Sequence, residues 1–275
     1  MLPRNPGCNL TRREAIALFA TVGTLTAAPD EALHFTALDH IETSAPDSAK
    51  TAAFYARLFG APVWKNNKSA RRYVMLGSRY IAIEHARQPF GVDHFSVGIE
   101  GFVVGDIHAW LKQRAIAYRD YPSGKDLNVD DPDGIHIQLS ADNTWVDMKD
   151  RIASPEPSPE VASPIFRPTG LDHILLNVSD LPKSVAFYSK IFGQATQDNN
   201  RTWFQAGKSR IGLLQAPAGT KPGVNYYCVS AAAFDFAAAL KKLEEAGARV
   251  KRPEVAGVPE FRDPDGLLVQ VMSPR

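Results

Sequence analysis

The feature that most constrains this chain is an internal repeat. The segment Leu38–Gly60, LDHIETSAPDSAKTAAFYARLFG, returns without a gap as Leu171–Gly193, LDHILLNVSDLPKSVAFYSKIFG, and eleven of the aligned positions are identical. Agreement over such a stretch indicates a duplicated structural unit, which has to be recognised before any local element is assigned. The chain is therefore expected to consist of two halves built on one plan.

Each copy of the repeat predicts a strand followed by a helix. The run Ala37–Thr43 alternates apolar and polar residues, which is typical of a half-buried strand. Within Asp47–Leu58 apolar residues recur at helical spacing, and Gly60 follows as a helix stop. Two short strand-like runs come next, at Arg72–Leu76 and Arg79–His85. The repeat thus opens a module with the order βαβββ.

Each half holds a second module of the same kind. The run Val92–Ile99 carries the Asp-His pair of the first strand again, and Val224–Ser230 is its counterpart in the second half. Both second modules end on a similar sequence motif, DPDGIHIQL at Asp131–Leu139 and DPDGLLVQV at Asp263–Val271. Pro presets φ and Gly supplies a positive φ, so DPDG predicts a turn before a closing strand.

Four such modules predict an α+β fold with two domains. The N-terminal domain is expected at residues 36–148 and the C-terminal domain at residues 169–275, each with its two modules paired in an eight-stranded mixed sheet. The segment 149–168 between them is rich in Pro and Ser and predicts a semi-extended spacer that takes no part in a core.

Residues 1–30 do not fit the repeat. Arg12 and Arg13 precede a short apolar run that ends in small residues, a pattern that resembles a twin-arginine export signal. We therefore expect a protein exported to the periplasm or beyond. The alternative is an ordinary amphipathic N-terminal helix on a cytoplasmic protein.

Composition limits the classes of partner. The formal net charge is +1, so no nucleic-acid partner is implied. No apolar run approaches the ~20 residues of a membrane span, so none is expected once the signal is removed. Cys8 and Cys228 are the two cysteines, and removal of the signal would leave one, so no internal disulfide is expected. The partner expected is a small-molecule substrate, and a homodimer is compatible with this composition.

Strand alternation directs a set of polar side chains to one face of the first half. Residues i and i+2 point to the same face, so His40 lies with Glu42, and His94 lies with Ser96. One position is compared on the first and on the last strand of each module. In the first half these four positions hold His40, Glu84, His94 and Gln138, and in the second half they hold His173, Leu214, Tyr226 and Gln270. Two imidazoles with a carboxylate suit a divalent metal, whereas a lone histidine is more often hydrogen-bonded within a core. The sequence favours a metal site in the first half and a degenerate one in the second.

The chain resembles the vicinal oxygen chelate superfamily, which includes glyoxalase I, type I extradiol dioxygenases and bleomycin-binding proteins. The resemblance rests on LDH at Leu38–His40, AFYARLFG at Ala53–Gly60, VDH at Val92–His94 and the two DPDG turns. It implies that paired modules curl into cup-shaped eight-stranded sheets. It also implies one metal ion at the floor of a cup, bound by residues from the first and last strands of its modules.

Carried over residue by residue, the resemblance implies His40, Glu84, His94 and Gln138 as metal ligands. The family usually has Glu at the position of Gln138, and a Gln can coordinate through its carbonyl oxygen but cannot take a proton. Proton transfer would then depend on Glu84, or on His136, which shares a face with Gln138. A shift of the strand by one residue would bring His85 to this face in place of Glu84.

Three functions remain open from the sequence. The first is a metal-dependent lyase or isomerase of the glyoxalase type, acting on a small substrate chelated through adjacent oxygens to one divalent ion, Zn, Ni, Mn or Fe(II). The second is an Fe(II)-dependent extradiol-type dioxygenase, since two histidines and one carboxylate form its ligand set. Against it, the family's two-half dioxygenases keep their metal in the C-terminal half. The third is a non-catalytic small-molecule binding protein of the bleomycin-resistance type.

Overall fold

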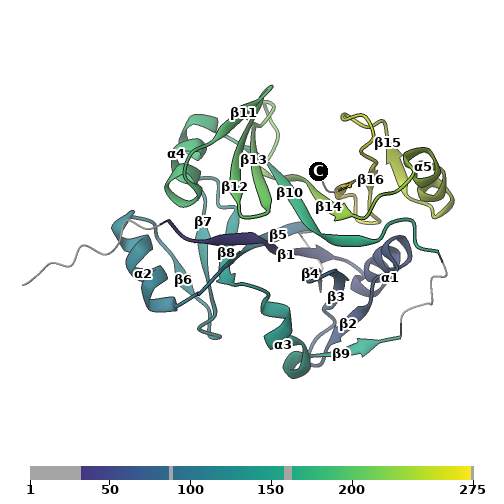
Figure 1. Cartoon of the computed structure of the whole chain (residues 1–275), viewed down its shortest axis with the longest axis horizontal. Helices are drawn as coiled ribbons and strands as arrows, with labels where there is room; N and C mark the ends of the chain where they lie inside the picture. The colour runs from purple at the N-terminus through teal and green to yellow at the C-terminus, as the bar shows by residue number, and fades with distance from the viewer. Residues whose placement is uncertain (1–31, 87–88, 158–162, 274–275) are drawn as a thin grey trace, which may run out of the picture. The chain divides into compact units, whose positions relative to one another are not determined.

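The structure is a computed structural model that describes residues 32–86, 89–157 and 163–273, and these residues lie in one compact unit, Ala32–Arg275 (Figure 1). The predicted export signal lies outside the described residues. The four predicted βαβββ modules are confirmed. The first consists of β1 (Phe35–Ala45), α1 (Ser48–Phe59), β2 (Val63–Asn66), β3 (Arg72–Leu76) and β4 (Arg79–His85).

The second module repeats this order, and the C-terminal half repeats both. The second module consists of β5 (Gly91–Ile99), α2 (Val104–Gln113), β6 (Arg119–Asp120), β7 (Asp126–Asp130) and β8 (His136–Ala141). The third consists of β10 (Pro168–Val178), α4 (Leu181–Phe192), β11 (Thr196–Asp198), β12 (Arg201–Ala206) and β13 (Ser209–Gln215). The fourth consists of β14 (Gly223–Ala231), α5 (Phe236–Glu245), β15 (Arg249–Lys251), β16 (Glu260–Arg262) and β17 (Leu268–Met272).

The two modules of each half share one mixed sheet. The strand order is β6-β7-β8-β5-β1-β4-β3-β2-β9 in the N-terminal half and β11-β12-β13-β10-β14-β17-β16-β15 in the C-terminal half. The first strands of paired modules, β1 and β5, run antiparallel at the centre, and each runs parallel to the last strand of its own module. This arrangement brings the four strands expected to carry metal ligands together in the middle of the sheet.

The N-terminal sheet has a ninth strand that the sequence did not predict. The segment after β8 forms α3 (Thr144–Ile152) and then β9 (Ala153–Glu156), which pairs antiparallel with β2 (Figure 1). Further along, Phe166 is buried against Phe59 and Phe234. Two described parts of the segment 149–168, expected to be a spacer, therefore belong to the sheet and to the core: Ala153–Glu156 and Phe166. β9 lies at the edge of the sheet, where a strand pairs through its backbone on one side and tolerates Pro. A Pro- and Ser-rich segment can therefore form such a strand without a recognisable strand pattern.

The motif residues of the repeat have local structural roles. The side chain of Asp47 caps α1 by accepting a hydrogen bond from the backbone of Lys50, and Asp180 caps α4 in the same way through Lys183. Such caps satisfy backbone N–H groups that the first helical turn leaves without partners. Gly60 ends α1 with a φ of 57°, a left-handed conformation that glycine adopts at little cost.

Each sheet of the unit has an apolar face and a face with polar residues. In the N-terminal sheet, Ile41, Ile81 and Phe95 belong to one continuous core that also includes buried residues of α1 and of the C-terminal half. On the opposite face of the same strands lie His40, Tyr80 and other residues discussed below. We call this second face of the N-terminal sheet the site face.

Contacts between the halves pair the same motif residues twice. The hydroxyl of Tyr55 on α1 donates to Asp263 of the second DPDG turn at 2.7 Å and lies 2.5 Å from the hydroxyl of Tyr227. In the reciprocal contact, Tyr188 on α4 donates to Asp131 of the first DPDG turn at 3.2 Å. Each DPDG aspartate therefore does more than form a turn, because it also binds the repeat tyrosine of the other half.

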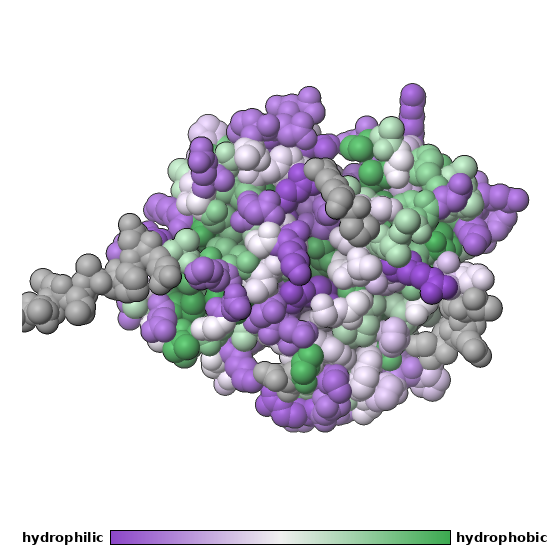
Figure 2. Space-filling model, in the orientation of Figure 1, coloured by the Kyte–Doolittle hydropathy of each residue, from purple (hydrophilic) through white to green (hydrophobic). Residues whose placement is uncertain are grey.

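The surface of the described residues offers no large apolar area. Large exposed apolar side chains are scattered over separate elements: Phe90, Val103, Tyr121, Val146 and Val255. The face in Figure 2 is a mosaic of hydrophilic and hydrophobic residues. Among the described residues, no helix has the length and apolar character needed to cross a membrane.

Candidate metal centre

The two predicted imidazole ligands meet on the site face. His40 on β1 and His94 on β5 come from adjacent antiparallel strands, and their Nε2 atoms lie 3.2 Å apart. Both side chains are buried. Their Nδ1 atoms contact the aspartates that precede them, Asp39 at 3.0 Å and Asp93 at 2.9 Å. The Asp-His pairs of the sequence are therefore bonded pairs, although strand alternation predicts that each aspartate points to the opposite face.

This arrangement fits a metal ion. A neutral imidazole has one N–H, and a carboxylate at Nδ1 holds that proton there, so Nε2 is left as an acceptor. Two acceptor nitrogens that face each other repel unless a proton or a cation lies beside both. Two bonds of about 2.1 Å from one metal ion to nitrogens at this separation meet at roughly 100°. Carboxylates at Nδ1 are also the usual outer support of metal-bound histidines.

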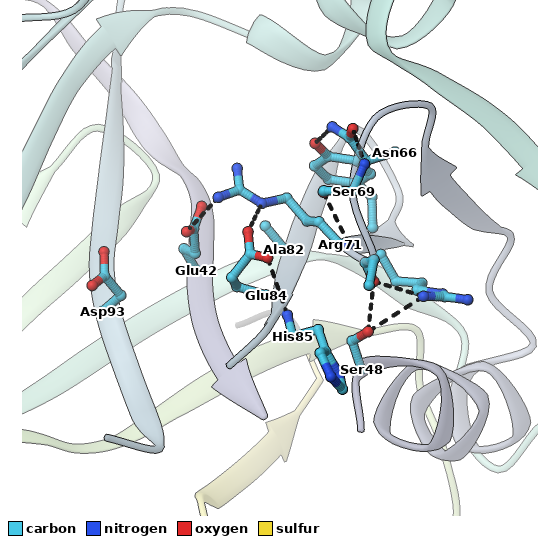
Figure 3. A network of polar contacts seen from close by, with 12 residues as sticks. Glu42, Ser48, Asn66, Ser69, Arg71, Ala82, Glu84, His85 and Asp93 are labelled. Atoms are coloured by element: carbon cyan, nitrogen blue, oxygen red, sulfur yellow. Dashed lines mark hydrogen bonds and ion pairs between the residues drawn. The ribbon is translucent and has the colours of Figure 1, made fainter. Parts of the chain in front are cut away.

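Beside Asp93, the carboxylate that lies close to His94 is that of Glu42, and not that of the predicted Glu84. Glu42 on β1 lies directly across from His94 on β5, and the ligand atoms of Glu42, Asp93 and His94 all lie within 4.8 Å of one another. Figure 3 shows Glu42 and Asp93 on neighbouring strands. Glu84 pairs with Ser44, further along the strands from Tyr80, which pairs with His40. It shares the site face but not the immediate surroundings of the histidines, and its role as ligand and proton carrier stays a prediction.

Arg71 joins the two glutamates. Its Nε donates to Glu84 at 2.7 Å and its Nη2 donates to Glu42 at 2.9 Å, so that the guanidinium lies between both carboxylates (Figure 3). Burial alone would lower the pKa of Arg71, but the negative charge of Glu42 and the bond to Glu84 raise it overall. Glu84 also accepts the backbone N–H of His85. The bridge fixes the direction of Glu42 while leaving its second oxygen available.

A cluster of oxygen atoms lies on the adjoining strands β7 and β8. Gln138 is buried, and its Oε1 atom has no hydrogen-bond partner among the described residues; the same is true of Asp126 Oδ1 and Asn128 Oδ1. Asn128 pairs directly with Gln138. Buried polar atoms without partners are costly. Burial raises the pKa of Asp126, partly offset by a Ser123 hydrogen bond and by the charges of His40 and His94. These carboxylate and amide oxygens are suitable ligands for a cation that prefers oxygen donors.

His136 lies at the margin of this group. It pairs with His94 across β5 and β8, and its Nδ1 contacts Asp130 at 2.5 Å. Its side chain is 41% exposed, in contrast to the buried His40 and His94. A hydrogen bond from Arg119 holds the pKa of Asp130 at about 2. His136 is thus a partly solvated imidazole beside the ligand group and not a member of it.

An aromatic wall closes the other side of the histidines. The ring of Tyr80 stacks on His40 with centroids 4.6 Å apart. Trp145 of α3 packs against Tyr80 and Tyr73, and Trp64 packs edge-on against Trp145. Glu84 lies on the site face as predicted, together with Ala82 and Tyr80, and His85 does not take its place.

The corresponding face of the C-terminal sheet lacks this ligand set. His173 contacts Asp172 at 2.6 Å, and its ring meets Trp203 and Tyr226 edge-on. Burial lowers the pKa of His173. Gln270 donates to the buried Glu260 at 3.1 Å, whereas its counterpart Gln138 keeps a free oxygen. The second imidazole of the first half is replaced here by the phenol of Tyr226.

Comparison with known proteins identifies the fold. Residues 170–271 match the family described as "Glyoxalase/Bleomycin resistance protein/Dioxygenase superfamily". The matched residues lie within the C-terminal half. The N-terminal half has the same module order and central strand pairing, so the same fold occurs twice in the described residues. No curated protein matches the chain by sequence.

Several solved structures share the superfamily fold across most of the chain. The Mn(II)-bound glyoxalase from Novosphingobium aromaticivorans is 16% identical, with a TM-score of 0.64 over 88% of this chain and 83% of that one. The 2,3-dioxygenase LapB from Pseudomonas sp. KL28 is 15% identical, with a TM-score of 0.67 over 89% and 94%. Homoprotocatechuate 2,3-dioxygenase from Arthrobacter globiformis is 15% identical, with a TM-score of 0.64 over 90% and 82%. At these identities the likeness shows the fold.

Sequence reasoning missed two acidic residues of the site. Glu42 was recognised as sharing a face with His40, but its position opposite His94 depends on the register between β1 and β5, which shifts at irregularities. Asp126 lies on β7, a short strand to which the repeat pattern assigns no site residue. A search for acidic residues i+2 from each predicted histidine would have found Glu42.

Proposed function

We propose that the protein is a metal-dependent lyase or isomerase of the glyoxalase type, with one divalent metal ion in the N-terminal half and a small substrate that presents two adjacent oxygens. The observation that carries the proposal is the pair of buried Nε2 atoms 3.2 Å apart, each on an imidazole whose Nδ1 contacts a carboxylate. The Mn(II)-bound glyoxalase with the same fold supports it.

In this proposal His40 and His94 hold the metal, with Glu42 as the carboxylate ligand and the Oε1 atom of Gln138 as an amide ligand. A divalent ion bound there would act as a Lewis acid toward the substrate oxygens. Asp39 and Asp93 keep both imidazoles in the tautomer that presents Nε2. Arg71 holds Glu42 in place through its Oε1 atom.

Proton transfer falls to the chain's own acidic groups. Asp126 lies close enough to His40 and His94 for their charges to affect its pKa, which burial raises above the ordinary value. A carboxylate of this kind accepts a proton more readily than an exposed aspartate, as a general base requires. His136, which is partly exposed, can exchange the proton with solvent. Both oxygens of Glu84 accept hydrogen bonds, one from Arg71 and one from the backbone of His85, so we assign to Asp126 the proton transfer that the sequence favoured for Glu84.

Metal analysis tests this proposal. The chain is purified without oxygen, and its metal content is measured beside His94→Ala and a matched His173→Ala variant in the other half. We expect about one metal ion per chain, lost in His94→Ala and retained in His173→Ala. Retention in His94→Ala would exclude the N-terminal centre. The absence of metal from all three proteins, even after divalent ions are added back, would point instead to a metal-free binding protein.

An extradiol-type dioxygenase is the second candidate. It is favoured by the residue types at the proposed centre: His94 lies close both to His40 and to Glu42, and two histidines with one carboxylate are the set used by non-haem Fe(II) oxygenases. Solved dioxygenases with this fold add support. Oxygen-electrode measurements on the iron-loaded protein with a catechol separate the two. Oxygen uptake supports the dioxygenase, and zinc, nickel or manganese as the resident ion without uptake supports the lyase.

A further inference from the structure

A cavity lined by residues of both halves lies beside the junction between them, and neither His40 nor His94 lines it. Its volume is about 780 Å³, within the usual range for small-ligand sites. It is bordered by β1, by the turn before β4, by the start of β10 and by the β12–β13 hairpin. Hydroxyl and amide side chains make up much of its lining: Ser78, Thr169, Thr196, Gln205 and Ser230.

Three cationic side chains line this cavity, and one acidic side chain does. The cations are Arg79, Lys208 and Arg210, and the acid is Asp172. Asp172 lies 3.7 Å from Arg210, whereas no ion pair joins the exposed Lys208 to an acidic residue among the described ranges. An uncompensated positive charge beside two guanidinium groups in a concave site attracts anions.

Both arginines are held in position by neighbouring side chains. Arg79 donates to the buried Asp39 at 2.9 Å and is also paired with Asp142 at 2.9 Å. Arg210 lies over the ring of Trp203, 4.7 Å from its centroid, and its Nη2 is 3.7 Å from Asp172. Guanidinium groups fixed in this way lose little conformational freedom on binding, and their planar donors match the oxygens of phosphate.

We propose that this cavity binds an oxyanion with at least two negatively charged oxygens, such as inorganic phosphate or the phosphate group of a small ester. Arg79 and Arg210 provide fixed donors on opposite halves of the chain, and Lys208 provides the uncompensated charge. The surrounding hydroxyl and amide groups bind the remainder of an ester. None of the residues assigned as metal ligands lines this cavity, although Arg79 is bonded to Asp39, the partner of His40.

Calorimetric titration of the metal-free full-length chain at fixed ionic strength tests the proposal, with inorganic phosphate and ribose 5-phosphate as separate probes. Lys208→Gln is compared with Lys190→Gln, an exposed lysine on α4. We expect saturable binding in the wild type, unchanged in Lys190→Gln and weakened ~5- to 10-fold in Lys208→Gln. Tighter binding of the ester than of phosphate would identify an ester as the ligand, and equal binding would identify the free ion.

A second variant protects the test against an unrelated loss of structure. Arg210→Gln should abolish the binding while the far-ultraviolet circular dichroism spectrum and the thermal midpoint stay close to those of the wild type. The fluorescence of Trp203, which lies under Arg210, should change on phosphate addition in the wild type and not in Arg210→Gln. Absence of saturable binding in the wild type, or equal affinity in the Lys208 and Lys190 variants, would overturn the proposal.

Discussion

Substitution of Tyr55 by Phe should weaken the junction between the halves more than the equivalent change at Tyr188. The Tyr55 hydroxyl is fully buried and takes part in two hydrogen bonds, at 2.7 Å to Asp263 and at 2.5 Å to Tyr227. A buried hydrogen bond to a charged group contributes about 1.5–3 kcal/mol and a neutral one about 1 kcal/mol. Tyr55→Phe should therefore lower the free energy of unfolding by about 2.5–4 kcal/mol.

Tyr188→Phe is the matched control, because it removes the same hydroxyl from the same repeat position. Tyr188 makes one longer bond, 3.2 Å to Asp131, so we expect a loss of about 1–2 kcal/mol. Urea unfolding followed by circular dichroism measures both values, provided that the slope against urea is the same in all three proteins. A loss in Tyr55→Phe no larger than in Tyr188→Phe would refute the assigned hydrogen-bond network.

Three further predictions concern the site, the backbone and pH. Glu42→Gln should weaken metal binding at least ~10-fold by calorimetry and Glu84→Gln less than ~3-fold, and equal losses would contradict the ligand assignment. Gly207→Ala should lower the free energy of unfolding by well over ~2 kcal/mol, and Gly101→Ala by only about 1–2 kcal/mol. Both glycines have a positive φ, but a Cβ at Gly207 would lie 2.2 Å from the backbone of Thr36, whereas a Cβ at Gly101 would have no atom within 4 Å. Burial raises the pKa of Asp263 in the folded chain above its ordinary 3.8, so folding takes up a proton and stability from this group falls as pH rises through that interval. Relative to Asp263→Asn, the wild type should lose stability from pH 3 upward and level off once the folded pKa is passed; a gain over this range in chemical unfolding curves would contradict the assignment.

The modules were predictable because local and repeated signals agreed. The caps at Asp47 and Asp180, the stop at Gly60 and the alternation around His40 all follow from short-range rules, and the repeat showed that they occur twice. The meeting of His40 and His94 was predictable for the same reason, since they occupy the same position in paired modules.

What could not be predicted depends on contacts between distant segments. The strand β9 has no side-chain pattern, because it is positioned by backbone bonds to β2. The proximity of Glu42 to His94 follows from the register of two strands that contain irregularities, and no local rule specifies such a register. Arg71 lies in a loop, where a charged residue normally points to solvent, and only the structure shows it between two carboxylates.

The reciprocal tyrosine–aspartate contacts have a consequence for the origin of the two halves. Contacts in which residue i of one unit meets residue j of the other, and j meets i, are the mark of an isologous interface between identical subunits. Tyr55 with Asp263 and Tyr188 with Asp131 are such a pair. The chain has the form of an ancestral two-fold dimer whose subunits became covalently joined. Once joined, the halves could diverge on their site faces, where only the first has two imidazoles, while both continued to form the interface.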